Sequence, residues 1–264
     1  MPTRKQIAEI VKRQFDNTPA GSLIETAWLA VYQVLLWHET FDSQTYLPHI
    51  IDADKLRPRK LGLKPNIWAE RAANINSFLA QQLASKLDDV HSLCDLLMCS
   101  PEYKGRQRQN PLGIGFSELI CHILRKFGSE NIEYKTEYPA RQLFPGVQLQ
   151  SRSKNPSIDV LALKNGVPVA IITTKWSIRH DRLTDVIDES ISYRSAAMRC
   201  GLKVPVFFVT NEFDPARLDK VISNEYVEAV VHVCPKLLLD VCGLNGRLTQ
   251  LKDLPHLVNL TSKW

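Results

Sequence analysis

A short polar turn between two β-rich runs is the feature that most restricts the fold of this chain. The runs cover residues 158–163 and 167–174, and Lys164-Asn165-Gly166 joins them. Asn-Gly readily adopts the left-handed backbone conformations that a tight turn requires, so the two runs are expected to pair as antiparallel strands. The sequence therefore predicts a β-hairpin in the second half of the chain.

The segments that follow and precede this hairpin show helical and strand patterns in turn. Apolar residues recur every three or four positions at 116–127, and a more polar helix is predicted at 183–199. Residues 204–210 and 227–233 are continuous apolar runs, which are typical of strands buried on both faces. The order helix, hairpin, helix, strand, strand predicts an α/β fold with a mixed central β-sheet flanked by helices.

The first hundred residues differ in pattern from the rest. Helical spacing of apolar residues covers 4–15, 23–37 and 67–87, and the connections between these segments carry basic runs that are typical of loops. We therefore expect an N-terminal helical region at 1–100 and an α/β core at 101–264, without requiring that the two fold separately.

The composition is that of a globular chain of 264 residues, with 44% hydrophobic residues, 11 glycines and 15 prolines. This hydrophobic fraction excludes a disordered chain, and the low glycine count excludes a collagen-like one. No apolar run reaches the roughly 18–20 residues that span a bilayer, and the charged N-terminus lacks the apolar stretch of a secretory signal. A cytoplasmic protein is therefore expected.

Charge and cysteine content add two weaker expectations. A total of 33 Lys and Arg against 28 Asp and Glu gives a net charge of +5, which is a mild preference for polyanionic partners. The six cysteines, at positions 94, 99, 121, 200, 234 and 242, form no CxxC motif. In a reducing cytosol they are expected to be buried thiols rather than zinc ligands or disulfides.

Two charged residues interrupt the apolar hairpin. Asp159 is the one acid in the first run, and Lys175 directly follows the second. Burying either charge alone would cost several kcal/mol, so each needs a partner, a metal or solvent. Phosphodiester hydrolysis uses such a pair, because carboxylates hold Mg²⁺ and a lysine acts beside the attacking water and the scissile phosphate. The plain alternative is that both charges face water at strand ends.

The sequence after the hairpin carries a family resemblance. Residues 175–182 read Lys-Trp-Ser-Ile-Arg-His-Asp-Arg, and Thr173 stands two positions before Lys175. Behind Asp159, this pattern resembles the signature of the CCGG family of type II restriction endonucleases, within the PD-(D/E)xK nuclease superfamily. That family carries its second carboxylate on the following helix, fourteen residues beyond the lysine, and Glu189 stands at that position.

The resemblance implies a restriction-endonuclease-like α/β/α core and Mg²⁺-dependent cleavage of double-stranded DNA. It implies that Asp159 and Glu189 hold the metal ions and that Lys175 helps to orient and deprotonate the attacking water. Thr173 would occupy the position where other superfamily members carry an acid. The implied target is a palindromic site with CC and GG half-sites, cut by a homodimer in the cytoplasm of a prokaryote. The match covers about residues 113–210 and gives no assignment for the first hundred residues.

The residues also admit other functions. One is the same class of enzyme with half-sites separated by one base pair, because the reading residues recognise half-sites rather than their spacing. Another is a nuclease-fold DNA-binding protein without cleavage, although intact Asp159, Lys175 and Glu189 argue against it. A third is a repair or recombination nuclease, which would not need a sequence reader.

Arg179, Asp181 and Arg182 are the candidate base-reading residues. An arginine presents a fork of donors that matches the O6 and N7 acceptors of guanine in the major groove, and an aspartate accepts from the cytosine amino group. Two arginines around an aspartate at the start of a helix therefore suit two adjacent G·C pairs. The alternative is an Arg–Asp ion pair at the helix start, a common surface feature.

Glu118 is a further acidic candidate. It lies in the predicted 116–127 helix on the side away from the apolar residues. Nucleases of the fold that this chain resembles often bring a glutamate from the preceding helix to the metal site. Glu133 and Glu137 are weaker candidates. The alternative for Glu118 is a solvated side chain on an amphipathic helix.

Strand parity gives a geometric prediction. Side chains alternate between the faces of a strand, so Asp159 reaches the face of Thr173 and Lys175 only if it pairs with an odd-numbered residue. A two-residue Asn165-Gly166 turn would pair it with an even-numbered one. We therefore predict a three-residue turn with Gly166 in a left-handed conformation, while a bulge elsewhere in the hairpin would restore the parity by another route.

Overall fold

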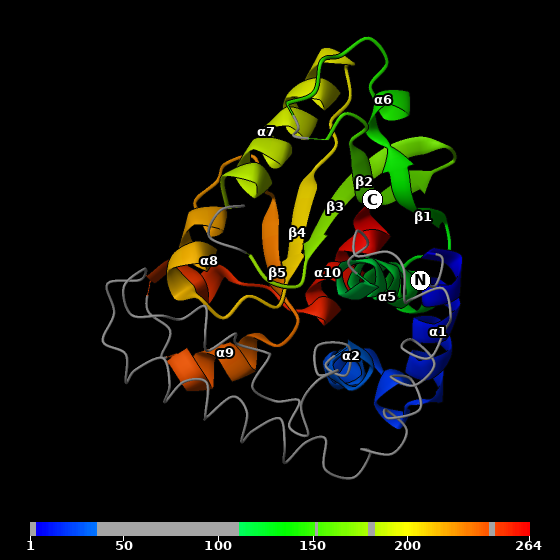
Figure 1. Ribbon diagram of the computed structural model, residues 1–264, viewed down its shortest axis with the longest axis vertical. Helices are drawn as coiled ribbons and strands as arrows, with labels where there is room; N and C mark the ends of the chain where they lie inside the picture. The colour runs from blue at the N-terminus through cyan, green and yellow to red at the C-terminus, as the bar shows by residue number, and fades with distance from the viewer. Residues whose placement is uncertain (1–3, 36–110, 151–152, 179–182, 243–245) are drawn as a thin grey trace, which may run out of the picture. The chain divides into compact units, whose positions relative to one another are not determined.

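A computed structural model describes residues 4–35, 111–150, 153–178, 183–242 and 246–264 (Figure 1). These residues divide into two compact units, one within Met1–Gly115 and Lys236–Gly243, the other within Phe116–Pro235 and Leu244–Trp264. None of the described helices is long and apolar enough to cross a membrane. The predicted helix at 67–87 and the predicted boundary at residue 100 lie outside the described residues.

The N-terminal part of the first unit is helical. Its elements in chain order are α1 (Arg4–Asn17), η1 (Pro19–Gly21), η2 (Ile24–Thr26) and α2 (Ala27–Leu35). α1 buries Ile7, Val11 and Phe15, about one residue per turn, which confirms the predicted helix at 4–15. The predicted helix at 23–37 is confirmed only from residue 27, because the residues before it form the tighter turn η2.

The second unit contains a five-stranded mixed sheet. Its strands in chain order and in spatial order are β1 (Ile132–Pro139), β2 (Ser157–Lys164), β3 (Val167–Lys175), β4 (Val206–Thr210) and β5 (Ala229–His232). The first three strands are antiparallel, and the last three are parallel. The crossovers between parallel strands are α7 (Leu183–Arg199) and α8 (Pro215–Ile222). The predicted α/β class with a mixed sheet is confirmed, whereas β1 was not predicted.

Helices flank the sheet on both faces. On one face Tyr193 of α7 shares a buried apolar cluster with Ile171 of β3. On the other face the hydroxyls of Thr174 and Ser117 lie 2.9 Å apart, which joins β3 to α5 (Pro111–Phe127). Strand alternation separates Ile171 from Thr174, so α7 and α5 cover opposite sides of β3. The remaining described helices are α6 (Ala140–Leu143), α9 (Pro235–Cys242), η7 (Gly246–Gln250), α10 (Leu254–Leu260) and η8 (Thr261–Lys263).

The hairpin turn differs from the predicted one. Lys164 pairs with Val167, so the turn contains two residues, and both Asn165 and Gly166 have positive φ angles, 52° and 79°. The prediction of a left-handed Gly166 is confirmed, but the prediction of a three-residue turn is wrong. Asn-Gly with both residues at positive φ matches the twist of the flanking strands, and this local preference prevails.

A β-bulge restores the parity that the turn does not provide. The register shifts between Ala162 and Leu163, because Leu163 pairs with Pro168 whereas Ala162 pairs with Ala170, which leaves Val169 as the extra residue. Continued along the strands, the shifted register sets Asp159 opposite an odd-numbered residue. The bulge is the second route that the sequence analysis named.

Cys121 and Cys234 are buried free thiols, as predicted, whereas Cys200 is a free thiol that is only half-buried. Cys94 and Cys99 lie outside the described residues.

Candidate active site

The amine of Lys175 lies between two carboxylates that come from different elements. Its Nζ is 3.1 Å from Asp159 Oδ2 and 4.0 Å from Glu189 Oε2. Lys175 ends β3, Asp159 lies on β2 and Glu189 on α7. The structure thus brings together the three residues that the sequence pattern singled out. Their side chains stay partly accessible, with exposed fractions of 35% for Lys175, 16% for Asp159 and 25% for Glu189.

The Asp159 carboxylate is fixed by the neighbouring strand. Its Oδ2 accepts a 2.7 Å hydrogen bond from the Thr174 backbone N–H as well as the contact from Lys175. This geometry depends on the bulge, because a regular two-residue hairpin would turn Asp159 to the opposite face of β2. Thr173 is buried on the Lys175 face of β3, as predicted.

The charge on Lys175 is maintained by its neighbours. Burial by itself lowers the pKa of the amine, but the negative charges of Asp159 and Glu189 outweigh burial and raise the pKa above its ordinary value. In this arrangement Lys175 is therefore an ammonium ion. It can donate hydrogen bonds and neutralise negative charge, and it is a poor proton acceptor.

Glu189 is held from the next turn of its own helix. Its Oε1 lies 3.1 Å from the Tyr193 hydroxyl, which is also 3.1 Å from the Ser157 carbonyl oxygen at the start of β2. The Tyr193 ring stacks on Phe144, with 6.4 Å between ring centroids. Burial raises the pKa of the Glu189 carboxyl, Lys175 opposes that shift, and the net direction is upward.

Glu137, a weaker candidate in the sequence analysis, is a fourth member of this group. On β1 it stands between Thr136 and Tyr138, which pair with Val160 and Ile158 of β2. The register therefore sets Glu137 opposite Asp159. Its carboxylate accepts a 2.6 Å hydrogen bond from the Ser157 hydroxyl, and its negative charge contributes to the raised pKa of Lys175. Its φ angle of 48° is uncommon for a residue other than glycine, and such strain concentrates at functional sites.

The other two glutamate candidates have different surroundings. Glu118 is buried, so the alternative of a solvated side chain is wrong. Glu118 lies on α5 next to Ser117, which contacts β3 on the face away from α7. The part of Glu118 in a metal site stays a prediction. Glu133 is an exposed residue that pairs with Lys135 at 3.3 Å and lies opposite Leu163, towards the hairpin turn.

The donor chemistry at Lys175 suits a divalent cation held by few protein ligands. Asp159 and Glu189 already enclose one positive charge, the Lys175 ammonium. Mg²⁺ is commonly bound by one or two carboxylates and completes its shell with water and substrate phosphates. Within the described residues no group of three or more His, Cys, Asp and Glu side chains is arranged to hold a metal ion. Two carboxylates are the number of protein ligands that such a Mg²⁺ site uses.

The base-reading candidates Arg179, Asp181 and Arg182 lie outside the described residues. The residues on either side are described. Ile178 closes the stretch after β3, and Leu183 begins α7, so the segment directly precedes a helix, as predicted.

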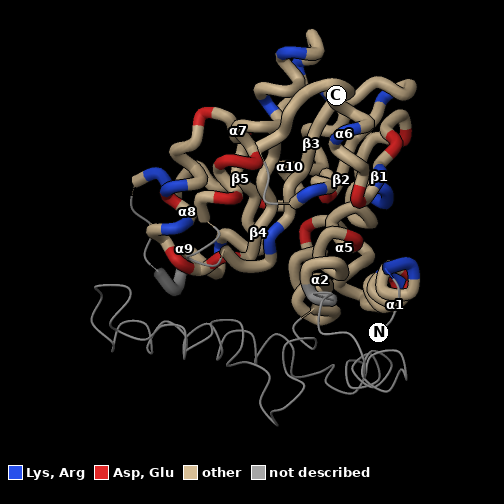
Figure 2. Tube along the Cα trace, turned by 45° about the horizontal axis from the view of Figure 1, so that its top comes forward, with Lys and Arg blue, Asp and Glu red and all other residues tan. Residues whose placement is uncertain are grey.

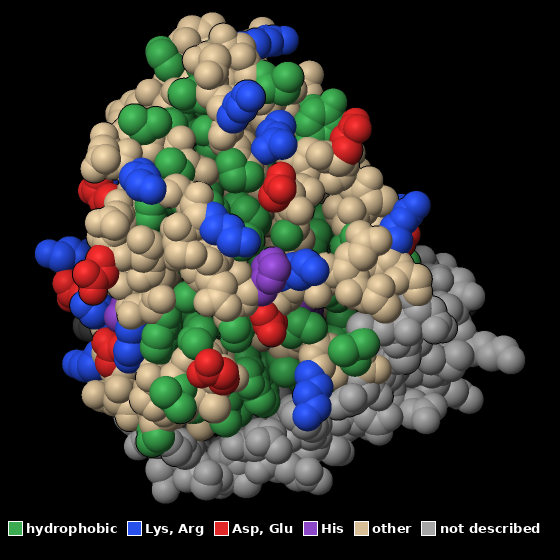
Figure 3. Space-filling view, turned by 180° about the vertical axis from the view of Figure 1, so that it is seen from behind, with side chains coloured by type: hydrophobic (Ala, Val, Ile, Leu, Met, Phe, Trp, Pro, Cys, Tyr) green, Lys and Arg blue, Asp and Glu red, His purple; other side chains and the backbone are tan. Residues whose placement is uncertain are grey.

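Charge on the described surface is mixed. Basic and acidic residues are interleaved along the chain (Figure 2), and on the face in Figure 3 the Lys and Arg side chains stand among Asp and Glu.

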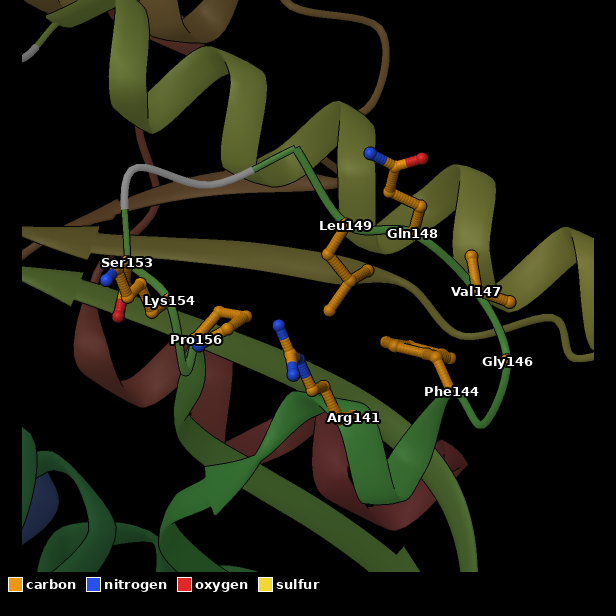
Figure 4. A pocket seen from close by; sticks show the side chains of 9 residues that line it. All are labelled: Arg141, Phe144, Gly146, Val147, Gln148, Leu149, Ser153, Lys154 and Pro156. Atoms are coloured by element: carbon orange, nitrogen blue, oxygen red, sulfur yellow. The ribbon is translucent and has the colours of Figure 1, made fainter.

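A hollow of about 570 Å³ lies beside the site (Figure 4). Phe144, which stacks on Tyr193, forms part of its wall, and Pro156 directly precedes β2. The Arg141 side chain points into the opening, and Lys154 lies at its edge. The sequence analysis did not predict this hollow, because its walls come mainly from an irregular loop.

No family model matches this chain, and a comparison with curated proteins gives no significant match. Its function is therefore inferred from the residues, their geometry and the motif resemblance.

Proposed function

We propose that this protein is a type II restriction endonuclease that cleaves double-stranded DNA with Mg²⁺ at a palindromic site containing CC and GG half-sites. The observation that carries the proposal is that the carboxylates of Asp159 and Glu189 both lie within 4.0 Å of the Lys175 amine. Sixteen and fourteen residues separate the two acids from the lysine, and they come from three different elements. The motif resemblance led us to expect this grouping.

The side chains have separable tasks in this proposal. Asp159 and Glu189 would hold the cation, which supplies positive charge at the phosphate and acidifies a bound water. The Thr174 N–H keeps the Asp159 carboxylate in place. The Lys175 ammonium donates hydrogen bonds to the attacking water and to the scissile phosphate, and it offsets the negative charge that grows there during the reaction.

Base reading is assigned to Arg179, Asp181 and Arg182 from the chemistry of their side chains. Their positions, four to seven residues after Lys175, keep base reading and catalysis on one short stretch of chain. A palindromic site is two-fold symmetric, so a homodimer would present one catalytic group to each strand. Such an enzyme would act in the cytoplasm of a prokaryote.

The test is cleavage of phage DNA by the purified protein with Mg²⁺, analysed on a gel. Discrete bands that disappear with EDTA are expected, and sequencing of the ends would show whether the half-sites adjoin or are one base pair apart. A smear would indicate a nonspecific nuclease, and intact DNA that shifts in a binding gel would indicate binding alone. Either result would overturn the proposal.

Variants connect that activity to the site. Asp159→Ala should abolish cleavage while site-specific DNA binding persists, because metal chemistry and base reading use different side chains. Glu133→Ala removes an exposed acid on β1, paired with Lys135, and is the matched control. Full activity in Asp159→Ala would remove the active site from the proposal.

A further inference from the structure

The peptide groups of Ile178 are held on both sides by charged side chains. The Ile178 N–H donates a 2.6 Å hydrogen bond to Glu212 Oε2, and the Ile178 carbonyl oxygen accepts a 2.7 Å hydrogen bond from Arg217 Nη1. Ile178 is buried and directly precedes Arg179. A backbone unit with both polar groups engaged by fixed side chains has little freedom to turn.

Pairing of the parallel strands places Glu212 beside Ile178. Lys175 at the end of β3 pairs with Thr210 at the end of β4. One step further, the Asn211 N–H donates a 3.0 Å hydrogen bond to the Trp176 carbonyl oxygen, so the two chains stay in register beyond the sheet. Glu212 follows in that extension, and its backbone N–H donates to Thr210 Oγ1.

Further charges hold the two side chains. Arg217 Nη1 lies 3.4 Å from Glu212 Oε2, and Arg217 Nε lies 3.1 Å from Asp214 Oδ2. Asp214 caps α8, because its Oδ1 accepts from the Ala216 N–H, and the Asp214 N–H donates to Glu212 Oε1. His232 Nε2 completes the group with a 3.0 Å contact to the Glu212 carbonyl oxygen.

This group is costly to bury. Glu212 and Asp214 are 5% and 4% exposed. Buried ion pairs commonly add little stability compared with apolar side chains of similar size, and their better attested role is to select one arrangement. Here the arrangement selected is the course of the chain at Ile178, three residues on from Lys175.

We propose that Glu212 and Arg217 are positioning residues for base reading, which act through the Ile178 backbone to set where the segment after it lies relative to Lys175. The inference rests on the proposed function. It assigns part of the sequence specificity to two residues 30 or more positions beyond the reading motif.

The test compares Arg217→Met with Val221→Ala. Val221 is buried on the same helix, and its truncation weakens α8 packing but keeps the Glu212 and Arg217 side chains that hydrogen-bond to Ile178. Cleavage rates are measured on a cognate duplex and on duplexes with one substituted base pair, and thermal unfolding is followed for both variants. The ratio of cognate to substituted rates should fall roughly tenfold in Arg217→Met, in the range of one lost base contact, and stay within about twofold in Val221→Ala.

Two conservative variants maintain the test if Arg217→Met does not fold. Arg217→Lys keeps the charge but loses the fork, in which Nη1 reaches Ile178 and Glu212 while Nε reaches Asp214. Glu212→Gln keeps an acceptor for the Ile178 N–H without the charge. Both should lower the ratio relative to Val221→Ala. Equal ratios in all variants at matched stability would overturn the positioning role and leave the proposed function intact. A parent protein without site-specific cleavage would overturn the proposed function, and this inference with it.

Discussion

A 3.1 Å hydrogen bond joins the Tyr193 hydroxyl to Glu189 across one turn of α7, and the same hydroxyl lies 3.1 Å from the Ser157 carbonyl oxygen. Ser157 begins β2, the strand that carries Asp159. The hydroxyl therefore links Glu189 to the strand that carries Asp159, the other carboxylate proposed to hold the metal. Glu189 is positioned by the sheet as well as by its own helix.

Removal of this hydroxyl should weaken the site without unfolding it. In Tyr193→Phe we expect the cleavage rate to fall about tenfold and the Mg²⁺ concentration for half-maximal activity to rise, because a hydrogen bond to a charged group contributes about 1.5–3 kcal/mol. Titration of Mg²⁺ at saturating DNA is the measurement. Tyr138→Phe, in a partly buried tyrosine on β1 packed against the same apolar cluster, is the control. Unchanged Mg²⁺ dependence in Tyr193→Phe would reduce Tyr193 to a packing role.

Loss of the central amine should affect catalysis more than binding. Lys175→Ala removes the ammonium between the two carboxylates, and we expect cleavage to fall by at least about 100-fold, the lower range for removal of a donor that stabilises negative charge in the transition state. Single-turnover cleavage and a binding gel separate the two effects. Lys135→Ala, in a lysine on β1 paired with Glu133, should leave both unchanged. Equal losses of binding and cleavage in Lys175→Ala would mean that the lysine is a DNA contact.

Replacement of a reading arginine should change specificity rather than overall affinity. Arg179→Ala and Arg182→Ala should each lose about 1–3 kcal/mol of discrimination for a G·C pair, because each removes a bidentate contact to guanine. Competition binding with cognate and substituted duplexes measures this difference. If affinity falls equally on all sequences, the arginines contact phosphate instead.

Acid should destabilise the fold through His232. Burial lowers the pKa of its imidazole from 6.5 to about 4, and the ring is neutral because Nδ1 accepts from the Cys234 N–H. Between these two pH values the unfolded chain binds a proton that the folded chain does not. The free energy of unfolding should therefore fall as the pH drops from 6.5 towards 4, by as much as about 3 kcal/mol, and this contribution should level off below.

A matched variant isolates this contribution from the carboxyl groups that titrate in the same range. His232→Gln retains an N–H donor for the Glu212 carbonyl oxygen and has no proton to gain. Urea unfolding at several pH values should give a steeper loss of stability for the parent than for the variant. Parallel curves would show that His232 does not carry the pH dependence.

The proposed catalytic group was predicted because its members match a motif of the family that the chain resembles. Asp159 and Lys175 interrupt an apolar hairpin, and the resemblance assigns Glu189 by its position fourteen residues beyond Lys175. A bulge was named as one route to the required parity, but its position was not predicted, because the extra residue lies between apolar neighbours. Pro168 was the available signal, since a proline inside a strand is found at edges and bulges.

Other parts of the structure had no comparable rule. β1 was missed because three of its eight residues are charged, although Ile132 and Tyr134 alternate with charged neighbours as in an amphipathic edge strand. Glu137 was given little weight for the same reason. The contacts of Glu212 and Arg217 with Ile178 join residues 34 and 39 positions apart, and no local pattern indicates them.

The extra residue Val169 lies between the tip of the hairpin and the part of the sheet that carries Asp159 and Lys175. The turn sets only the pairing of Lys164 with Val167, whereas the residues beyond the bulge determine which face Asp159 occupies. Nothing lies within 4 Å of the position that a side chain at Gly166 would take. Exposed loop tips of this kind tolerate inserted peptides. An epitope or a fluorescent label placed between Asn165 and Gly166 would therefore report on the protein while Asp159 and Lys175 keep their contact.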